Sequence, residues 1–371
     1  MEMFAQVCVL YERHLHGQQI RAVPLPAASS GASRLAEKAR VILLPSAAAN
    51  HGGGGWNIQP AAYSHFDADR LCLSASSPAC APVRYDYNLV THTLHLDDTA
   101  CNNATEEHAL ECYVIQAVTA DGIQVPITVA HRKDISLCGQ NPLLLHAYGV
   151  YGISLETPFE MEAAQLMRRG FVFAWAHIRG GGEGGRCWHA AAMQGRKQVS
   201  IDDLNRCSEE LVRRGYTSAD RMAGSAASAG GAIMLAAAQQ RPELWRALVL
   251  QSPFVSVLAA MSAPQAALTV EEYEEWGNPH VPDQLKLMQR YCPEQNWTAA
   301  ANGRQHALAV LVHAAPNDPR VSPHGALRFA AAMRGTSCRV MLRMTSGGHF
   351  GNIEEKIHEY AFLIKTLRQL A

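Results

Sequence analysis

The first 115 residues alternate short apolar runs with polar, turn-rich stretches. Runs such as "AQVCVLYER", "ARVILLP", "RLCLSASS" and "NLVTHTLHL" are long enough for single strands, and no helical period is sustained between them. Short apolar runs bounded by turn residues are typical of antiparallel strands. Residues 1–115 are therefore predicted to form an all-β segment.

A different pattern begins at residue 116. Two apolar runs flank Asp121-Gly122, a dipeptide that favours a hairpin turn. Apolar strands then alternate with helical segments, including a helix expected at 200–215 with Ser200 as its N-terminal cap. Strands separated by helices form mostly parallel sheets covered on both faces. The predicted fold class is therefore α/β over residues 116–371, preceded by the all-β segment 1–115.

Composition and charge narrow the class of function. The chain is 48% hydrophobic and 18% charged, and its formal net charge is −1, so nothing favours binding to nucleic acid or to anionic lipid. No uncharged apolar run reaches the roughly 18 residues of a membrane span, and the N-terminus lacks the pattern of a signal peptide. The ten cysteines are scattered without a C-x-x-C pair, which predicts reduced thiols and a cytoplasmic location.

The stretch "GSAASAGGA" (224–232) surrounds Ser228 with small residues, where a strand is expected to turn into a helix. A serine on such a tight turn is exposed as a nucleophile, and small neighbours let the strand and helix backbones approach closely. Ala226 occupies a position where this motif normally has glycine, so the motif here is A-x-S-x-G. A helix-packing turn is the alternative interpretation of this stretch alone.

A serine nucleophile needs a base, and the base needs a carboxylate that orients it. Asp318 in "NDPRV" and His349 in "GGHFG" follow the strands expected at 306–315 and 338–344. The chain order Ser, Asp, His and the position after strands match an α/β-hydrolase site. Taken singly, either residue could be an ordinary loop residue, so the prediction depends on the three together.

Two groups are candidates for stabilising the oxyanion of an acyl-transfer intermediate. The backbone N–H of Ala229 opens the helix after the nucleophile, and Tyr148 lies in "LLHAYGVYG", where a loop is expected after an early strand. A tyrosine packed in the core is the alternative for Tyr148.

The loop "GGGEGG" (180–185) also fits the G-x-G-x-x-G pattern of a dinucleotide site through Gly180, Gly182 and Gly185. The residues that follow are interrupted by Gly195 and are expected to be irregular rather than helical. No strand ending in an acidic residue follows at the required distance, so a nucleotide cofactor is not predicted.

Six segments together resemble the prolyl oligopeptidase family of serine peptidases, especially its oligopeptidase B and prolyl endopeptidase-like branches. They are "HAYGVYGISL", "AHIRGGGEGGRCWH", "SAGG", "LTVEEYEEWGNP", "NDPRV" and "GGHFG". The resemblance covers residues 116–371 and implies an α/β-hydrolase catalytic domain with a seven-bladed β-propeller cap. It implies that Ser228, Asp318 and His349 form the triad and that Tyr148 is an oxyanion donor.

The resemblance also implies substrate-binding residues. Arg320 matches a residue that holds a substrate carbonyl, and Glu272 and Glu274 match the acidic pair that receives a basic side chain in oligopeptidase B. Two nearby carboxylates suit an Arg or Lys side chain. The alternative is that both are exposed acids in the first turn of a helix.

Two features depart from the family pattern. The β-rich segment is too short for seven blades and resembles the last one or two, so we expect either a truncated gene model or a reduced cap. The second departure is Ala226, where a residue other than glycine resembles the prolyl endopeptidase-like branch. In that branch, ester or thioester cleavage is more plausible than peptide cleavage.

The predicted function is that of a serine peptidase acting on short peptides, with cleavage after basic residues as one option and no metal or organic cofactor. The alternatives are an esterase or thioesterase with the same triad, and a catalytically weak protein whose exposed apolar surface binds a partner. The sequence carries no signal for an oligomeric state.

Overall fold

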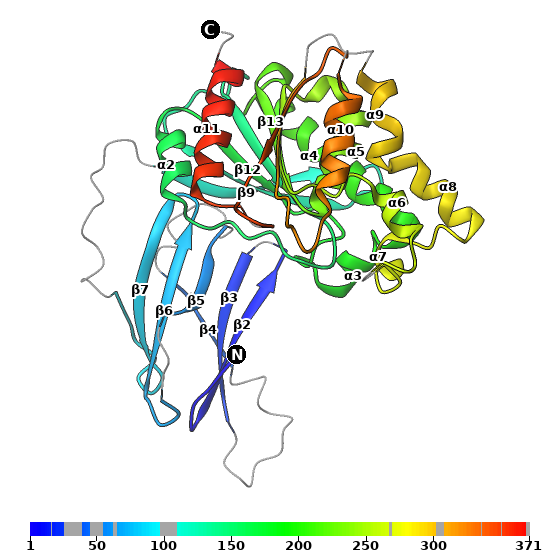
Figure 1. Cartoon of the computed structure of the whole chain (residues 1–371). Coiled ribbons are helices and arrows are strands. Elements are labelled where there is room, and N and C mark those ends of the chain that lie inside the picture. Colours follow the sequence, from blue (N-terminus) through cyan, green and yellow to red (C-terminus); the bar gives the residue numbers. More distant parts are fainter. Residues whose placement is uncertain are drawn as a thin grey trace. The chain divides into compact units, whose positions relative to one another are not determined.

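The computed structural model describes most of the chain (Figure 1). The described residues are 1–15, 17–25, 39–44, 55–61, 65–96, 110–266, 269–301, 308–334, 336–349 and 351–368. They group into two compact units. Residues 1–115 fall in the first unit, together with Thr128–Asp134 and Glu156–Gly170, and the second unit contains Gln116–Ile127, Ile135–Leu155 and Phe171–Ala371.

The first unit contains two four-stranded antiparallel sheets, as the strand pattern predicts. One sheet has the order β1 (Glu2–Met3), β2 (Val7–His14), β3 (Gly17–Pro24) and β4 (Arg40–Ile42). The other has the order β5 (Asn57–Pro60), β6 (Arg70–Ser77), β7 (Cys80–Asn88) and β8 (Leu94–Leu96). Inward side chains of both sheets, among them Ile20, Leu71 and Leu73, share one hydrophobic core. Burial alternates along β6 because successive residues of a strand face opposite sides.

The six strands β11 to β16 of the second unit belong to an eight-stranded sheet in the order β16-β15-β14-β13-β11-β12-β10-β9. The strands are β9 (Leu110–Val118), β10 (Gln124–Arg132), β11 (Leu143–Ala147), β12 (Val172–Ala176), β13 (Met222–Ala227), β14 (Ala247–Gln251), β15 (Ala309–Ala314) and β16 (Arg339–Met344). Strands β11 to β16 pair in parallel. Strands β12 and β15 are buried along their whole length and mostly apolar, as expected for strands covered on both faces.

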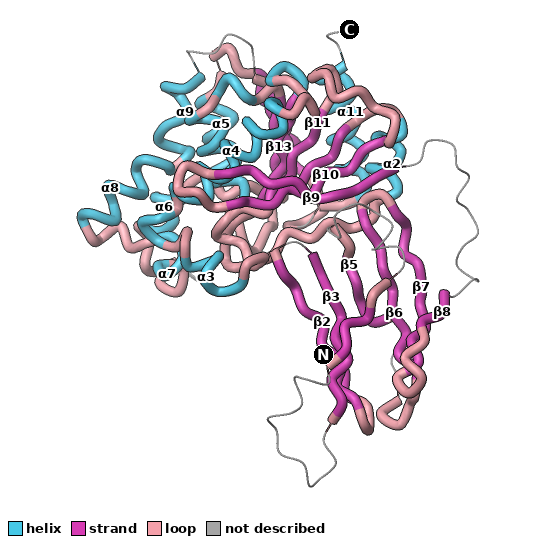
Figure 2. Tube along the Cα trace, turned by 180° about the vertical axis from the view of Figure 1, so that it is seen from behind, coloured by secondary structure: helices cyan, strands magenta, loops and turns pink. Residues whose placement is uncertain are grey.

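Helices lie in the connections between these strands and after the last strand. They are α3 (Gly185–Ala190), α4 (Gln198–Arg213), α5 (Gly230–Gln240), α6 (Val257–Met261), α7 (Tyr273–Trp276), α8 (Pro282–Tyr291), α9 (Pro293–Ala301), α10 (Pro323–Ala332) and α11 (Ile353–Arg368), and α2 (Met161–Arg168) belongs to the first unit. Figures 1 and 2 show α11 on one side of the sheet and α4, α5 and α10 on the other. Among the described residues, no helix is both long and apolar enough to cross a bilayer.

Two local predictions were wrong. Ser200 does not cap the helix expected at 200–215, because α4 already begins at Gln198 and Ser200 lies inside its first turn. The segment after the glycine-rich loop is not wholly irregular, since α3 begins at Gly185. Gly195 does separate α3 from α4, as its interruption of the helical pattern indicates.

Candidate active site

Ser228 lies directly between strand β13 and helix α5, on a strained turn. Its φ of 50° falls in the left-handed region, which costs a non-glycine residue about 1–3 kcal/mol. The turn is held from both sides: the Ser228 N–H donates to the Gln251 carbonyl at 2.9 Å, and the Ser228 carbonyl accepts from the Phe254 N–H at 2.8 Å. The surrounding structure therefore fixes the conformation that lifts the Ser228 side chain out of the strand.

The small residues around Ser228 are required by close backbone packing. A Cβ built on Gly230 would lie 2.9 Å from Tyr148 Cδ2 and 3.0 Å from Tyr148 Cα. A Cβ on Gly231 would lie 2.6 Å from Pro253 Cβ, and such contacts cannot form without movement of the backbone. Ala226 keeps its methyl group in the interior at 7% exposure. The non-glycine residue of the A-x-S-x-G motif is thus accommodated in the packed sheet.

Asp318 and His349 are in direct contact. The Nδ1 atom of His349 lies 2.8 Å from Asp318 Oδ2, and both side chains are almost fully buried. Burial opposes ionisation of Asp318, but N–H bonds from Val321 and Arg320 and the contact with His349 outweigh it and lower the pKa of the carboxyl. An ionised Asp318 that accepts a hydrogen bond from the Nδ1–H of His349 orients the imidazole and makes Nε2 its proton-accepting nitrogen.

Ser228, Asp318 and His349 all lie at the carboxyl edge of the parallel sheet. Ser228 follows β13 directly, and Asp318 and His349 follow β15 and β16 within five residues. Backbone bonds connect these ends, since the Ser252 N–H after β14 donates to the His313 carbonyl of β15 at 2.8 Å. The structure therefore joins Asp318 to His349 by a hydrogen bond and places Ser228 at the same edge, where sites of α/β proteins form.

The two candidate oxyanion donors lie beside this turn. Ala229 is 2% exposed and immediately precedes α5, so its backbone N–H belongs to the end of a helix where N–H groups lack helical partners. Tyr148 follows β11 and packs against Gly230. Burial and the negative charges of Glu272 and Glu275 raise the pKa of Tyr148 to about 12, so the phenol remains a proton donor at neutral pH.

Of the three predicted substrate-binding residues, the structure places two near Tyr148. The charges of Glu272 and Arg320 both act on the Tyr148 hydroxyl. Glu272 Oε2 accepts hydrogen bonds from the Tyr151 hydroxyl and from Trp276 Nε1, the latter at 2.9 Å. Arg320 is exposed and donates its backbone N–H to Asp318.

The third predicted residue, Glu274, is exposed on the short helix α7 and does not form a pair with Glu272. The carboxylate that accompanies Glu272 near Tyr148 is Glu275, which is 5% exposed. Residues three apart share a helix face, whereas residues two apart do not. Helical periodicity across α7 would have identified Glu275 in place of Glu274.

The glycine-rich loop is explained by backbone packing. A Cβ on Gly180 would lie 2.1 Å from the Gly149 carbonyl oxygen, and one on Gly182 would lie 2.2 Å from that of Gly152. The loop is thus packed against the segment that carries Tyr148, which accounts for its glycines without a phosphate. In the described part of the chain, no group of three or more Cys, His, Asp or Glu residues could hold a metal ion.

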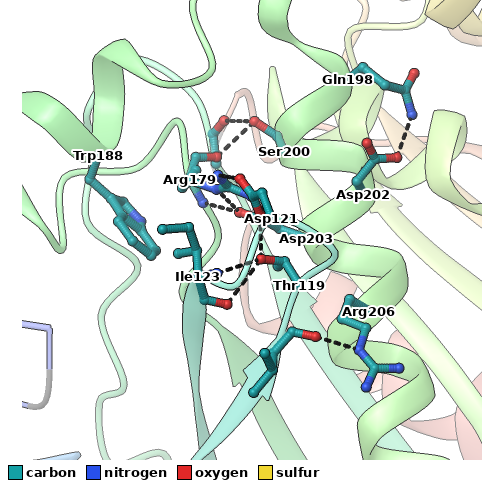
Figure 3. A network of polar contacts seen from close by, with 12 residues as sticks. Thr119, Asp121, Ile123, Arg179, Trp188, Gln198, Ser200, Asp202, Asp203 and Arg206 are labelled. Atoms are coloured by element: carbon teal, nitrogen blue, oxygen red, sulfur yellow. Dashed lines mark hydrogen bonds and ion pairs between the residues drawn. The ribbon is translucent and has the colours of Figure 1, made fainter.

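A buried arginine anchors the beginning of this loop (Figure 3). Arg179 donates to both carboxylate oxygens of Asp203 and to both of Asp121. Ser200 donates to the Arg179 carbonyl at 2.7 Å and lies 3.2 Å from the Gly149 carbonyl. Helix α4 therefore holds both the glycine-rich loop and the loop after β11.

Comparison with known proteins shows which family this chain resembles. The Prolyl oligopeptidase family matches residues 158–370. A protein of Xenopus laevis named "Prolyl endopeptidase-like" is 32% identical over 335 residues, which cover 90% of this chain and 44% of that protein. "Dipeptidyl aminopeptidase BI" of Pseudoxanthomonas mexicana is 33% identical over 269 residues, covering 69% of this chain and 36% of the relative.

Solved structures agree in fold. Oligopeptidase B from Trypanosoma brucei, solved with covalently bound antipain, superposes with a TM-score of 0.84 at 26% identity, covering 99% of this chain and 52% of that one. The chain spans about half the length of the relatives and structures that it matches. Together, the family match over residues 158–370 and the α/β-hydrolase sheet show that this chain belongs to the prolyl oligopeptidase family of serine peptidases.

Proposed function

We propose that this protein is a serine peptidase of short peptides in which Ser228, His349 and Asp318 form the catalytic triad. The observation that carries the proposal is the 2.8 Å contact between His349 Nδ1 and Asp318, at the sheet edge where Ser228 occupies its strained turn. A base oriented by a buried carboxylate and a partly exposed serine nucleophile are the parts that acyl transfer requires.

In the proposed reaction, the Ser228 oxygen attacks the substrate carbonyl carbon while His349 takes the hydroxyl proton. The carbonyl electron pair moves onto oxygen, where the Ala229 N–H and the Tyr148 hydroxyl donate hydrogen bonds to it. Collapse of this intermediate expels the amine, which receives the proton from His349, and leaves an acyl-serine. Water activated by His349 then releases the acid and restores Ser228.

Glu272 is our candidate for selecting a basic side chain, and Arg320 for holding a substrate carbonyl. Both lie within electrostatic reach of Tyr148. Glu272 carries a negative charge at this edge of the site, while Tyr151 and Trp276 fix its position through hydrogen bonds. A carboxylate held in this way suits a guanidinium or ammonium group.

We also propose that the first unit corresponds to two blades of a β-propeller. The support is its two four-stranded antiparallel sheets, because the propeller blade is a four-stranded sheet.

The test compares Ser228→Ala with Ser262→Ala, which removes a hydroxyl at the C-terminal cap of helix α6 that donates to the Leu258 carbonyl. Both are assayed on short peptide amides with arginine or a neutral residue before the bond, and on the matching esters. Ser228→Ala should abolish turnover of every substrate, and Ser262→Ala should leave it unchanged. Retention of turnover by Ser228→Ala refutes the triad, whereas cleavage of esters alone refutes the peptidase assignment. Equal rates on arginine and neutral amides refute the role of Glu272.

A further inference from the structure

The segment 148–152 begins at Tyr148, and Tyr151 near its other end has an unusual backbone conformation. Tyr151 adopts a φ of 59°, a left-handed conformation that a tyrosine holds only when its surroundings enforce it. Its backbone N–H donates to Glu275 Oε1 at 3.1 Å, and its hydroxyl donates to Glu272. The conformation of this segment therefore depends on two carboxylates from helix α7 and the residue just before it.

Glu275 is itself part of a buried charge cluster. Lys197 has no exposed side-chain surface, and its ammonium group donates to Glu275 Oε1. The other oxygen, Oε2, lies 2.6 Å from His189 Nε2. The Lys197 ammonium also lies 4.9 Å from the centre of the Trp276 ring, where a cation is attracted to the aromatic face. One carboxylate thus connects α3, the start of α4 and the segment 148–152.

The cluster has no part in the chemical steps described above, yet it costs free energy to form. Burial lowers the pKa of Lys197 even though Glu275 opposes the change, so desolvation of this charge is only partly offset. Apolar residues would fill the space without that cost. The cluster instead fixes the orientation of the Glu275 carboxylate. Because this carboxylate accepts the Tyr151 N–H, it also fixes the backbone segment that begins at Tyr148.

We propose that Glu275, anchored by Lys197 and His189, is a positioning residue that aims the Tyr148 hydroxyl at the oxyanion. This inference rests on the proposed function, because it requires Tyr148 to be an oxyanion donor. A donor of this kind acts on charge that develops in the transition state, so misplacing it lowers kcat more than it changes KM.

A double-mutant cycle tests the proposal, using an activated ester and the full chain. We expect Glu275→Gln to lower kcat by roughly tenfold or more, with KM changed by less than about threefold. In a Tyr148→Phe background, the same change should lower kcat by less than about twofold, because the hydroxyl that Glu275 positions is already absent. Glu271→Gln, which removes an exposed carboxylate just before α7, is the control and should leave kcat unchanged.

An equal loss of kcat from Glu275→Gln in both backgrounds would overturn the proposal, as would no loss at all. If Glu275→Gln does not fold, the cycle is repeated with Lys197→Met and Glu275→Gln combined, which removes both buried charges but keeps an oxygen acceptor for the Tyr151 N–H. Failure of the proposed function is recognised separately, by a wild-type protein whose turnover survives Ser228→Ala.

Discussion

Three of the five non-glycine residues with positive φ in the described part of the chain lie at the edge of the sheet that carries the site. Tyr151, Ser228 and Ser252 all have positive φ, and they follow strands β11, β13 and β14 at the carboxyl edge of the sheet. Each is held by backbone hydrogen bonds or by a carboxylate described above. Strained residues of this kind persist only where the fold over-determines them, which is consistent with a site assembled on a rigid scaffold.

The glycine two residues after Ser228 gives a prediction at this scale. Gly230→Ala adds a methyl group 3.0 Å from Tyr148 Cα, so either the turn or the Tyr148 backbone must shift. We expect kcat/KM for an ester to fall roughly tenfold or more, because misplacement by about 1 Å is costly in catalysis. Gly325→Ala in α10 is the matched control, since its Cβ would meet side-chain atoms of Ser256 and Val255 rather than Tyr148. Equal activity of the two variants would show that the contact with Tyr148 does not matter.

Residue identity at the site was predictable only where the motif fixes the geometry. Ser228, Asp318 and His349 each follow a strand in a fixed order, and sequence order alone places them at one edge. No motif marks Glu275, because Glu274 beside it has the same chemistry; only the three-residue helical spacing from Glu272 distinguishes the two. Lys197 is a charged residue in a polar stretch, and only tertiary packing buries it.

Among the elements, the apolar strands and the long helices of the sheet were predictable because burial on both faces requires long apolar runs. The short helices α6, α7, α8 and α9 between β14 and β15 were not predicted. They span only a few turns, and tertiary contacts rather than a long amphipathic period determine them. The start of α4 was misplaced since Ser200 is used to hold two backbone carbonyls rather than to cap the helix.

Arg179 joins Asp121 in the β9–β10 turn to Asp203 in α4, and this contact gives a prediction about how stability depends on pH. Hydrogen bonds from Arg179 and Thr119 lower the pKa of Asp121 from 3.8 to about 2. A lowered pKa stabilises the folded state above the ordinary value, and this contribution is lost as the pH falls from about 4 through about 2. Asp121→Asn should therefore be less stable than wild type to urea at pH 6, and this difference should shrink at pH 3.

Asp283→Asn is the control for that measurement, because the Asp283 side chain is 90% exposed and pairs only with Lys286 on the surface of α8. Its free energy of unfolding should follow wild type at both pH values. A difference between Asp121→Asn and wild type that is the same at pH 6 and pH 3 would show that the Asp121 carboxylate does not contribute through its charge.

The molecule as a whole combines two units with different features. Residues 116–371 contain every predicted site residue and the whole of the family match. The all-β segment 1–115 forms sheets of the predicted type, but the strand pattern alone could not show that two sheets share one core. Such cores depend on contacts far apart in sequence, which periodicity does not report.

The central claim, that Ser228 is a nucleophile activated by His349, is tested most directly by fluorophosphonate labelling followed by peptide mass spectrometry. The account predicts one adduct, on Ser228, and a labelling rate roughly 10³-fold lower in His349→Gln. Labelling at another residue, or a His349→Gln variant that reacts as fast as wild type, would contradict it.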